Sequence, residues 1–214
     1  MDTKSNKGII RFVPNALTIG RLVLTVVFLF MVIYAGNMDR AKPAGFLLVA
    51  FILFVVTALT DIVDGYIARR YDVASKFGRM IDPAADKILV CGAFICFAIV
   101  GQPKLANFDF SPTAMVIFQW ATALIITIRE LWVTIRRHIA EARGVAFGAV
   151  WGGKIKMSLQ SFAIGTVTFG WAYVSRAWGD WFTLITLILM LTVTIVSGVQ
   201  SIVRPIKKNT PTDQ

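Results

Sequence analysis

The amino-acid sequence predicts an all-α integral membrane protein, a bundle of six transmembrane helices with both termini in the cytoplasm. Of its 214 residues, 57% are hydrophobic, and the mean hydropathy is +0.70. That composition is too apolar for a soluble globular domain. Six stretches have the roughly 20 mainly apolar residues that a helix needs to cross a bilayer. Basic residues also gather in alternate loops, as they do in multi-pass proteins.

The predicted spans follow one another with short connections. They cover residues 16–36, 44–68, 82–101, 111–134, 153–175 and 180–203. The first begins after Pro14-Asn15, a helix-start signal, and ends at Gly36-Asn37. The second is uncharged from Pro43 to Thr60. The third starts at Asp82-Pro83, where proline suits a first helical turn.

The last three spans have similar signals. The fourth opens at Ser111-Pro112, and the fifth begins near Gly152-Gly153. The sixth is uncharged from Trp181 to Val203 and ends at Arg204-Pro205. Because no soluble segment interrupts the series, we expect residues 1–214 to form a single transmembrane domain.

The distribution of basic residues predicts the orientation. Sixteen of the 22 Lys and Arg residues fall in the two termini, the connection between spans two and three, and the segment around spans four and five. The opposite side has only four, so both termini are predicted to be cytoplasmic. We therefore read the net charge of +10 as topology signals and attraction to anionic lipids or phosphate substrates, with no nucleic-acid partner. The expected location is the inner (cytoplasmic) membrane.

Four aspartates stand at the cytoplasm-facing ends of spans two and three, in the pattern D-x2-D-G-x2-A-R-x8-G-x3-D-x3-D. Spacings of three and four place Asp61 with Asp64, and Asp82 with Asp86, on one helix face. A carboxylate beside a membrane span is costly and signals a functional site. Converging carboxylates repel one another unless cations neutralise them, and such oxygen ligands suit Mg²⁺ or Mn²⁺. The sequence therefore predicts a metal centre.

The other residues of the pattern favour a ligand with a pyrophosphate group. Gly65 and Ala68 let a ligand or a helix approach the backbone closely, and Arg69 can bind phosphate oxygens. Two divalent ions would then bridge the phosphates. An acid pair at a helix end is often only a solvated cap, but four acids with two glycines at fixed spacing are typical of a site.

The remaining reactive side chains add no second site. Cys91 and Cys96 fall in one apolar stretch and are predicted to be free thiols. No Ser or Cys nucleophile has a paired base, and the lone His138 is expected at the membrane interface. We therefore expect no covalent enzyme intermediate.

The aspartate pattern resembles the signature of the CDP-alcohol phosphatidyltransferase family at all eight signature positions, and the likeness extends over nearly the whole chain. This resemblance implies a phosphatidyltransferase that moves the phosphatidyl group of CDP-diacylglycerol to a hydroxyl group and releases CMP. Further stretches, including Arg129-Glu130 and Trp151-Gly-Gly153-Lys154, are similar to members that use sn-glycerol 3-phosphate and make phosphatidylglycerophosphate. One departure is Gly152-Gly153, where a bulkier residue is expected before the second glycine.

The resemblance also implies residue roles. Asp61 and Asp82 would bridge two Mg²⁺ or Mn²⁺ ions, with Asp64 completing the first ion and Asp86 the second. Asp86 would also be the general base for the acceptor hydroxyl. The residues expected to bind the CDP-lipid are Asn15, Thr18, Gly65, Arg69, Ser75 and Gly78. A homodimer is implied as well.

An anionic acceptor requires a basic pocket. The candidates on the cytoplasmic side are Arg129, Arg136, Lys154 and Lys156, for which a role as topology anchors is an equal alternative. Two other functions remain open from the sequence. One is the same transfer to phosphatidylglycerol, serine or inositol phosphate, and the other is a cation- or proton-coupled transporter, because acids in membrane spans also mark ion pathways.

Overall fold

The computed structural model consists of α-helices joined by short connections. It describes the backbone of residues 3–38, 43–71, 76–142, 151–174 and 176–203, and the side chains of residues 18–38, 44–60, 84–140, 155–174 and 176–203. The six helices are α1 (Thr3–Gly36), α2 (Pro43–Tyr71), α3 (Lys76–Ile99), α4 (Pro112–Ala142), α5 (Trp151–Tyr173) and α6 (Ala177–Val203). The all-α prediction with six helices is confirmed.

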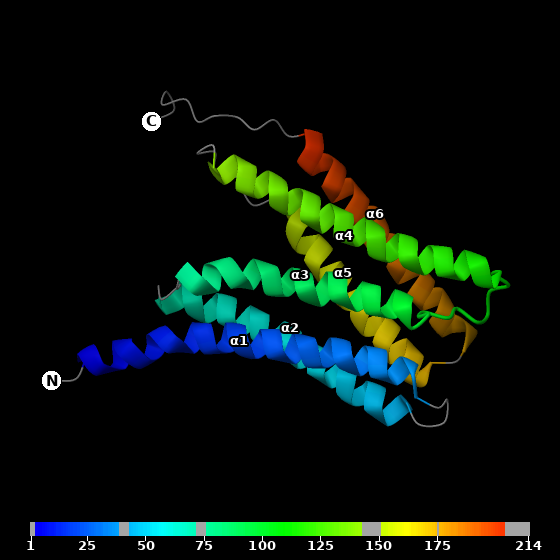
Figure 1. The fold of residues 1–214 in the computed structure, drawn as a ribbon, viewed down its shortest axis with the longest axis horizontal. Coiled ribbons are helices and arrows are strands. Elements are labelled where there is room, and N and C mark those ends of the chain that lie inside the picture. Colours follow the sequence, from blue (N-terminus) through cyan, green and yellow to red (C-terminus); the bar gives the residue numbers. More distant parts are fainter. Residues whose placement is uncertain (1–2, 39–42, 72–75, 143–150, 175, 204–214) are drawn as a thin grey trace.

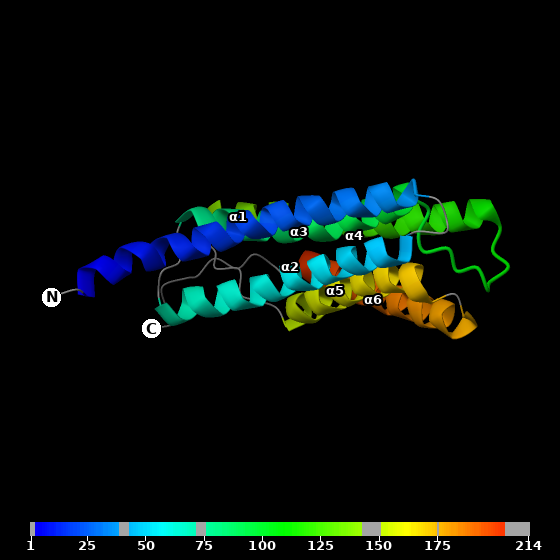
Figure 2. The same ribbon diagram turned by 90° about the horizontal axis from the view of Figure 1, so that it is seen from below.

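The helices form two layers of three. Helices α1, α3 and α4 lie in one layer and α2, α5 and α6 in the other (Figure 2). Packing between the layers joins α1 to α2, α3 to α5 and α4 to α6. Helix α1 begins, α2 ends, α3 begins and α6 ends at the same side of the bundle, on the left in Figure 1. The aspartate motif is therefore placed at the end of the bundle from which α1 starts.

The observed helix bounds lie within three residues of the predicted spans at most ends. Helix α3 begins at Lys76 and not at the predicted Asp82, α4 continues to Ala142 beyond the predicted end at residue 134, and the start of α1 differs most. We predicted that helix to begin after Pro14-Asn15, but it begins at Thr3 and continues through Pro14. Hydropathy marks where apolar residues begin, whereas helical hydrogen bonds are local and extend through the polar residues before them. A proline removes one such bond without preventing helix on both sides.

Within the described residues, three helices are long and apolar enough to cross a membrane. Their apolar segments are Thr18–Gly36 of α1, Pro112–Ala140 of α4 and Ala177–Val203 of α6. In α2 the described apolar part, Ala44–Thr60, is shorter. Large apolar side chains lie exposed along the outer faces, among them Phe30, Ile128 and Ile185. Because such surfaces are unfavourable in water, they identify a membrane protein.

The core lies between the two layers and contains side chains from every helix. Phe28 of α1 and Phe54 of α2 pack with ring centroids 5.4 Å apart. Phe97, Ile126, Ile164 and Met190 from the other four helices are fully buried around them. Glycines allow α1 and α3 to approach closely, since a Cβ on Gly92 would stand only 2.7 Å from Leu29 Cδ1.

Candidate functional site

The aspartates of the motif lie on the last turns of α2 and the first turns of α3. Asp61 and Asp64 belong to α2, and Asp82 and Asp86 to α3. Both helices pack against α1, and among the described residues α2 and α3 have no Cα atoms within 8 Å of each other. The two carboxylate-bearing helix ends are thus held at one end of the bundle by a third helix.

Asp86 is the one motif aspartate whose side chain is described, and it lies among charged residues from four helices. It is partly buried. Its carboxylate interacts electrostatically with Lys156 most strongly, then with Glu130, Arg21 and Lys87. Cations from three helices and one further carboxylate thus surround the Asp86 carboxylate.

The other predicted CDP-lipid ligands are only partly described. Thr18 is buried on α1, one helical turn before the equally buried Arg21. Asn15, Gly65, Arg69 and Gly78 lie in helices, but their side chains are outside the described set, as is Ser75 entirely. Their predicted contacts therefore remain predictions.

A buried ionic cluster links α4, α5 and α6. The Glu130 Oε1 atom accepts a hydrogen bond from Arg129 Nη1 at 2.9 Å and a second from Lys156 Nζ. Lys156 and Glu130 are 4% and 6% exposed. Arg129 Nη2 also donates to Ser197 Oγ of α6 at 3.0 Å. Isolated charges are costly to bury, so this pairing is what allows them to lie inside the bundle.

The four predicted acceptor-site cations separate into different environments. Lys156 and Arg129 lie in the buried cluster, and Arg136 Nη1 donates to the main-chain carbonyl of Ser201. The side chain of Lys154 is outside the described set. Burial of Lys156 favours a role in a site over a role as a topology anchor, because anchors extend to the membrane surface. His138 is exposed on α4.

The chemistry of the motif suits a divalent cation. Its potential donors are carboxylate oxygens at helical spacing on α2 and α3. Such oxygens are the ligands that Mg²⁺ and Mn²⁺ prefer. Within the described side chains there is no group of three or more His, Cys, Asp or Glu residues suited to hold a metal ion. Asp61, Asp64 and Asp82 lie outside that set. The metal assignment thus rests on donor type and helix placement.

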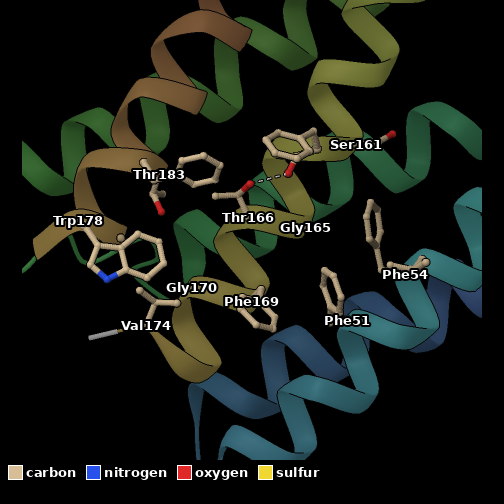
Figure 3. Close-up of a pocket in the computed structure, with 14 residues that line it drawn as sticks. Phe51, Phe54, Ser161, Gly165, Thr166, Phe169, Gly170, Val174, Trp178 and Thr183 are labelled. Carbon is tan, nitrogen blue, oxygen red and sulfur yellow. Dashed lines mark hydrogen bonds between the residues drawn. The ribbon is translucent and has the colours of Figure 1, made fainter. Parts of the chain in front are cut away.

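An apolar cavity of about 430 Å³ lies between α2, α5 and α6. Phe51 and Phe54 of α2 face Gly165 of α5, and Trp178 of α6 stands at the other side of the cavity (Figure 3). The lining is almost entirely aromatic and aliphatic, with a few hydroxyl groups such as that of Thr166, which donates to its own helix at Phe162 O, 2.9 Å away. Such a cavity accepts hydrocarbon and offers no partner to a charged group.

Sequence reasoning missed two buried residues of the site, Glu130 and Arg21. Each is a charged residue within or beside an apolar span, a signal that by itself marks functional positions. Glu130 was noted only as half of a similar Arg-Glu pair. The free state of Cys91 and Cys96 is confirmed.

Comparison with known proteins agrees with this geometry. Residues 11–196 match the family model described as CDP-alcohol phosphatidyltransferase. A "Probable phosphatidylglycerophosphate synthase" of Mycobacterium tuberculosis (strain CDC 1551 / Oshkosh) is 38% identical over 151 residues, covering 71% of this chain and 63% of that relative. The chain thus spans somewhat less than two thirds of the mycobacterial relative's length.

Two further relatives have the name CDP-diacylglycerol–glycerol-3-phosphate 3-phosphatidyltransferase. The Bacillus subtilis (strain 168) protein is 30% identical, with 77% of this chain and 94% of the relative covered. The Rickettsia felis protein is 34% identical, with 73% and 75% covered. The family match covers most of the chain and includes the aspartate motif. The protein therefore belongs to the CDP-alcohol phosphatidyltransferase family.

Proposed function

We propose that this protein transfers the phosphatidyl group of CDP-diacylglycerol to sn-glycerol 3-phosphate, giving phosphatidylglycerophosphate and CMP. The names of the relatives support this acceptor. The structural observation that carries the proposal is the buried position of Lys156 close to Asp86, with the half-buried Arg129 on the same Glu130 oxygen. A cation sheltered from water beside a candidate base suits an acceptor that has both a phosphate and a reacting hydroxyl.

In the proposed reaction the acceptor hydroxyl attacks the phosphorus that carries diacylglycerol. Asp86 accepts the hydroxyl proton as the new P–O bond forms. The bond from that phosphorus to the bridging oxygen breaks, and CMP leaves with the bridging oxygen. Arg69 lies on α2, one turn beyond Gly65, and would bind the diphosphate.

Asp61, Asp64, Asp82 and Asp86 would hold two Mg²⁺ or Mn²⁺ ions. When bound, such ions neutralise the diphosphate and stabilise the charge that develops on the leaving group. Two of the four carboxylates belong to α2 and two to α3, so donors for the ions would come from both helices.

We also propose that an acyl chain of CDP-diacylglycerol enters the cavity between α2, α5 and α6. The cavity lies along two helices that also have site residues, since Phe54 precedes Asp61 on α2 and Ser161 follows Lys156 on α5. The headgroup would then remain at the motif while the tail extends into the apolar half of the bundle.

The proposed topology has six spans with both termini cytoplasmic, in the inner membrane, and the site facing the cytoplasm. The start of α1 and the end of α6 at the same end of the bundle support it (Figure 1), as does the distribution of basic residues. A homodimer is part of the proposal. Labelling of single cysteines introduced at residues 37 and 210 would test the orientation.

The deciding experiment uses purified protein with CDP-diacylglycerol, Mg²⁺ and one acceptor at a time. We expect CMP release and phosphatidylglycerophosphate with glycerol 3-phosphate. Release with phosphatidylglycerol, serine or inositol phosphate instead would assign another acceptor to the same chemistry. No release with any of them, together with ion flux in proteoliposomes, would favour a transporter.

A further inference from the structure

Glu130 holds two cations on one carboxylate oxygen. Arg129 precedes it on α4, and Lys156 reaches it from α5. Consecutive residues on a helix point in different directions, so Arg129 must fold back to share Oε1 with Lys156. One anion thus fixes the positions of two cations that would otherwise repel each other.

The Glu130–Lys156 pair spans a gap between helices. Among the described residues no Cα atom of α4 lies within 8 Å of one in α5, although α4 packs on α3 and α6 and α5 packs on α2, α3 and α6. The two long side chains therefore meet where the helix backbones do not. The ion pair therefore holds both side chains at a fixed position between two helices whose backbones are not in contact.

A buried donor without a partner, close to this pair on α5, points to a ligand. Gln160 lies one helical turn beyond Lys156 on α5 and is 1% exposed, yet its Nε2 atom has no hydrogen-bond partner in the described part of the chain. A buried amide donor without a partner is rare in a closed core. It fits a site whose occupant supplies the acceptor oxygen.

Lys156 also lies between two carboxylates. It interacts with Glu130 directly, and it is the strongest charged neighbour of Asp86. If the charge of Glu130 were removed, Asp86 would be the remaining anion near the Lys156 ammonium. The ammonium would then move toward the carboxylate that the reaction needs.

We propose that Glu130 is a positioning residue of the acceptor site. Its carboxylate holds Arg129 and Lys156 between α4 and α5, so that they bind the phosphate of the acceptor. Because Lys156 is held by Glu130, it does not pair with Asp86, which can then accept the proton of the acceptor hydroxyl. Gln160, deeper in the same gap, donates a hydrogen bond to an oxygen of the acceptor's polyol part. This inference rests on the proposed function and adds which residue holds the cations of the acceptor site in place.

The test compares Glu130→Gln, Lys156→Gln and the double variant with the wild-type protein. Glu130→Gln keeps the size of the side chain but removes its charge. We expect its kcat to fall about tenfold or more, and its KM for glycerol 3-phosphate to rise by a similar factor. Lys156→Gln should raise that KM and should lower kcat less than Glu130→Gln does. The KM for CDP-diacylglycerol should stay unchanged in both.

The double variant gives the readout that a merely structural role would not produce. Without the Lys156 ammonium, Asp86 is no longer sequestered, so the double variant should regain most of the kcat lost in Glu130→Gln while its acceptor KM stays high. A double variant as slow as Glu130→Gln, or slower, would overturn the proposal. An unchanged KM for glycerol 3-phosphate in Glu130→Gln would overturn it as well.

Two further measurements keep these outcomes separable. If Glu130→Gln does not fold, Glu130→Asp replaces it, because it keeps the charge but shortens the reach to Lys156. Its kcat should lie below the wild-type value and should recover when Lys156→Gln is added. Calorimetric binding of glycerol 3-phosphate without CDP-diacylglycerol should weaken in Gln160→Leu, and unchanged binding would exclude Gln160. Lack of CMP release by the wild-type protein with every acceptor would instead reject the proposed function.

Discussion

Arg129 of α4 packs against Gly198 of α6, and a Cβ atom added to Gly198 would stand 3.2 Å from Arg129 Cγ. The neighbouring Ser197 Oγ accepts a hydrogen bond from Arg129 Nη2 and donates to the Thr194 carbonyl at 3.0 Å. Helix α6 therefore supplies both the space and a polar partner for the arginine. The position of its guanidinium depends on a residue without a side chain.

A side chain at Gly198 should disturb the acceptor site without touching the aspartates. In Gly198→Val the added methyl groups would displace Arg129, and we expect the KM for glycerol 3-phosphate to rise about tenfold. Steady-state kinetics with each substrate varied in turn would measure it. Val199→Ala, on the exposed side of α6, is the matched control. Equal KM values for glycerol 3-phosphate in the two variants would contradict the packing argument.

The positive charge of Arg129 and the two terminal nitrogens of its guanidinium group should contribute separately to acceptor binding. Arg129→Ala would lose a charge-assisted hydrogen bond to the acceptor phosphate, which contributes about 1.5–3 kcal/mol. The KM for glycerol 3-phosphate should therefore rise about ten- to a hundredfold. Arg129→Lys keeps the charge but has one nitrogen in place of the two that reach Glu130 and Ser197, and should recover only part of the loss. Arg176→Ala, exposed just before α6, serves as control. Full recovery by lysine would mean that charge alone matters.

The aspartate motif should make the activity depend on a divalent cation. Asp61→Asn or Asp82→Asn should lower turnover about a hundredfold or more, because each would serve both ions. Chelation should abolish activity, and Mg²⁺ or Mn²⁺ should restore it. Asp180→Asn is a control at the other end of the bundle, where its carboxylate accepts hydrogen bonds from Asn107. Undiminished activity in EDTA would disprove the metal assignment.

Filling the apolar cavity should affect long-chain lipid substrates more than short-chain ones. A Cβ at Gly165 would lie 3.4 Å from Phe51 Cε2, so the rest of a leucine would extend into the cavity. In Gly165→Leu we expect the KM for dioleoyl CDP-diacylglycerol to rise several-fold. The KM for a dihexanoyl analogue, whose chains stop short of the cavity, should change little. Equal effects on both lipids would show that the acyl chain lies elsewhere.

Packing of α1 against α3 should be sensitive to a single methyl group. A Cβ at Gly36 would stand 2.5 Å from Val100 Cγ1, and a β-branched side chain has few rotamers in which to move away. Gly36→Ala should therefore destabilise the protein by about 1–3 kcal/mol. Gly20→Ala, on the same helix with open space around it, should be neutral or slightly stabilising. Thermal unfolding in detergent would compare the two.

Local patterns predicted the helices and the placement of the motif because both depend on residues close in sequence. Apolar runs located all six helices, and the aspartates lie on helix ends as their spacing indicated. The predicted start of α1 was wrong because hydropathy does not detect helical turns made of polar residues. Glu130 was missed because its partner Lys156 is 26 residues away. Only tertiary structure brings α4 and α5 to opposite sides of one gap.

The division of the bundle into two groups of helices has a consequence for how such enzymes diversify. Apart from Ser75, residues proposed to hold the nucleotide lie on α1, α2 and α3. Those proposed to select the second substrate lie on α4 and α5, and α6 contacts the arginines among them. Among the described side chains, the two sets meet around Asp86. A lineage could therefore exchange one alcohol for another by altering the second half of the chain alone. Transplanting residues 112–203 between relatives with different products is the corresponding route for engineering new lipid headgroups.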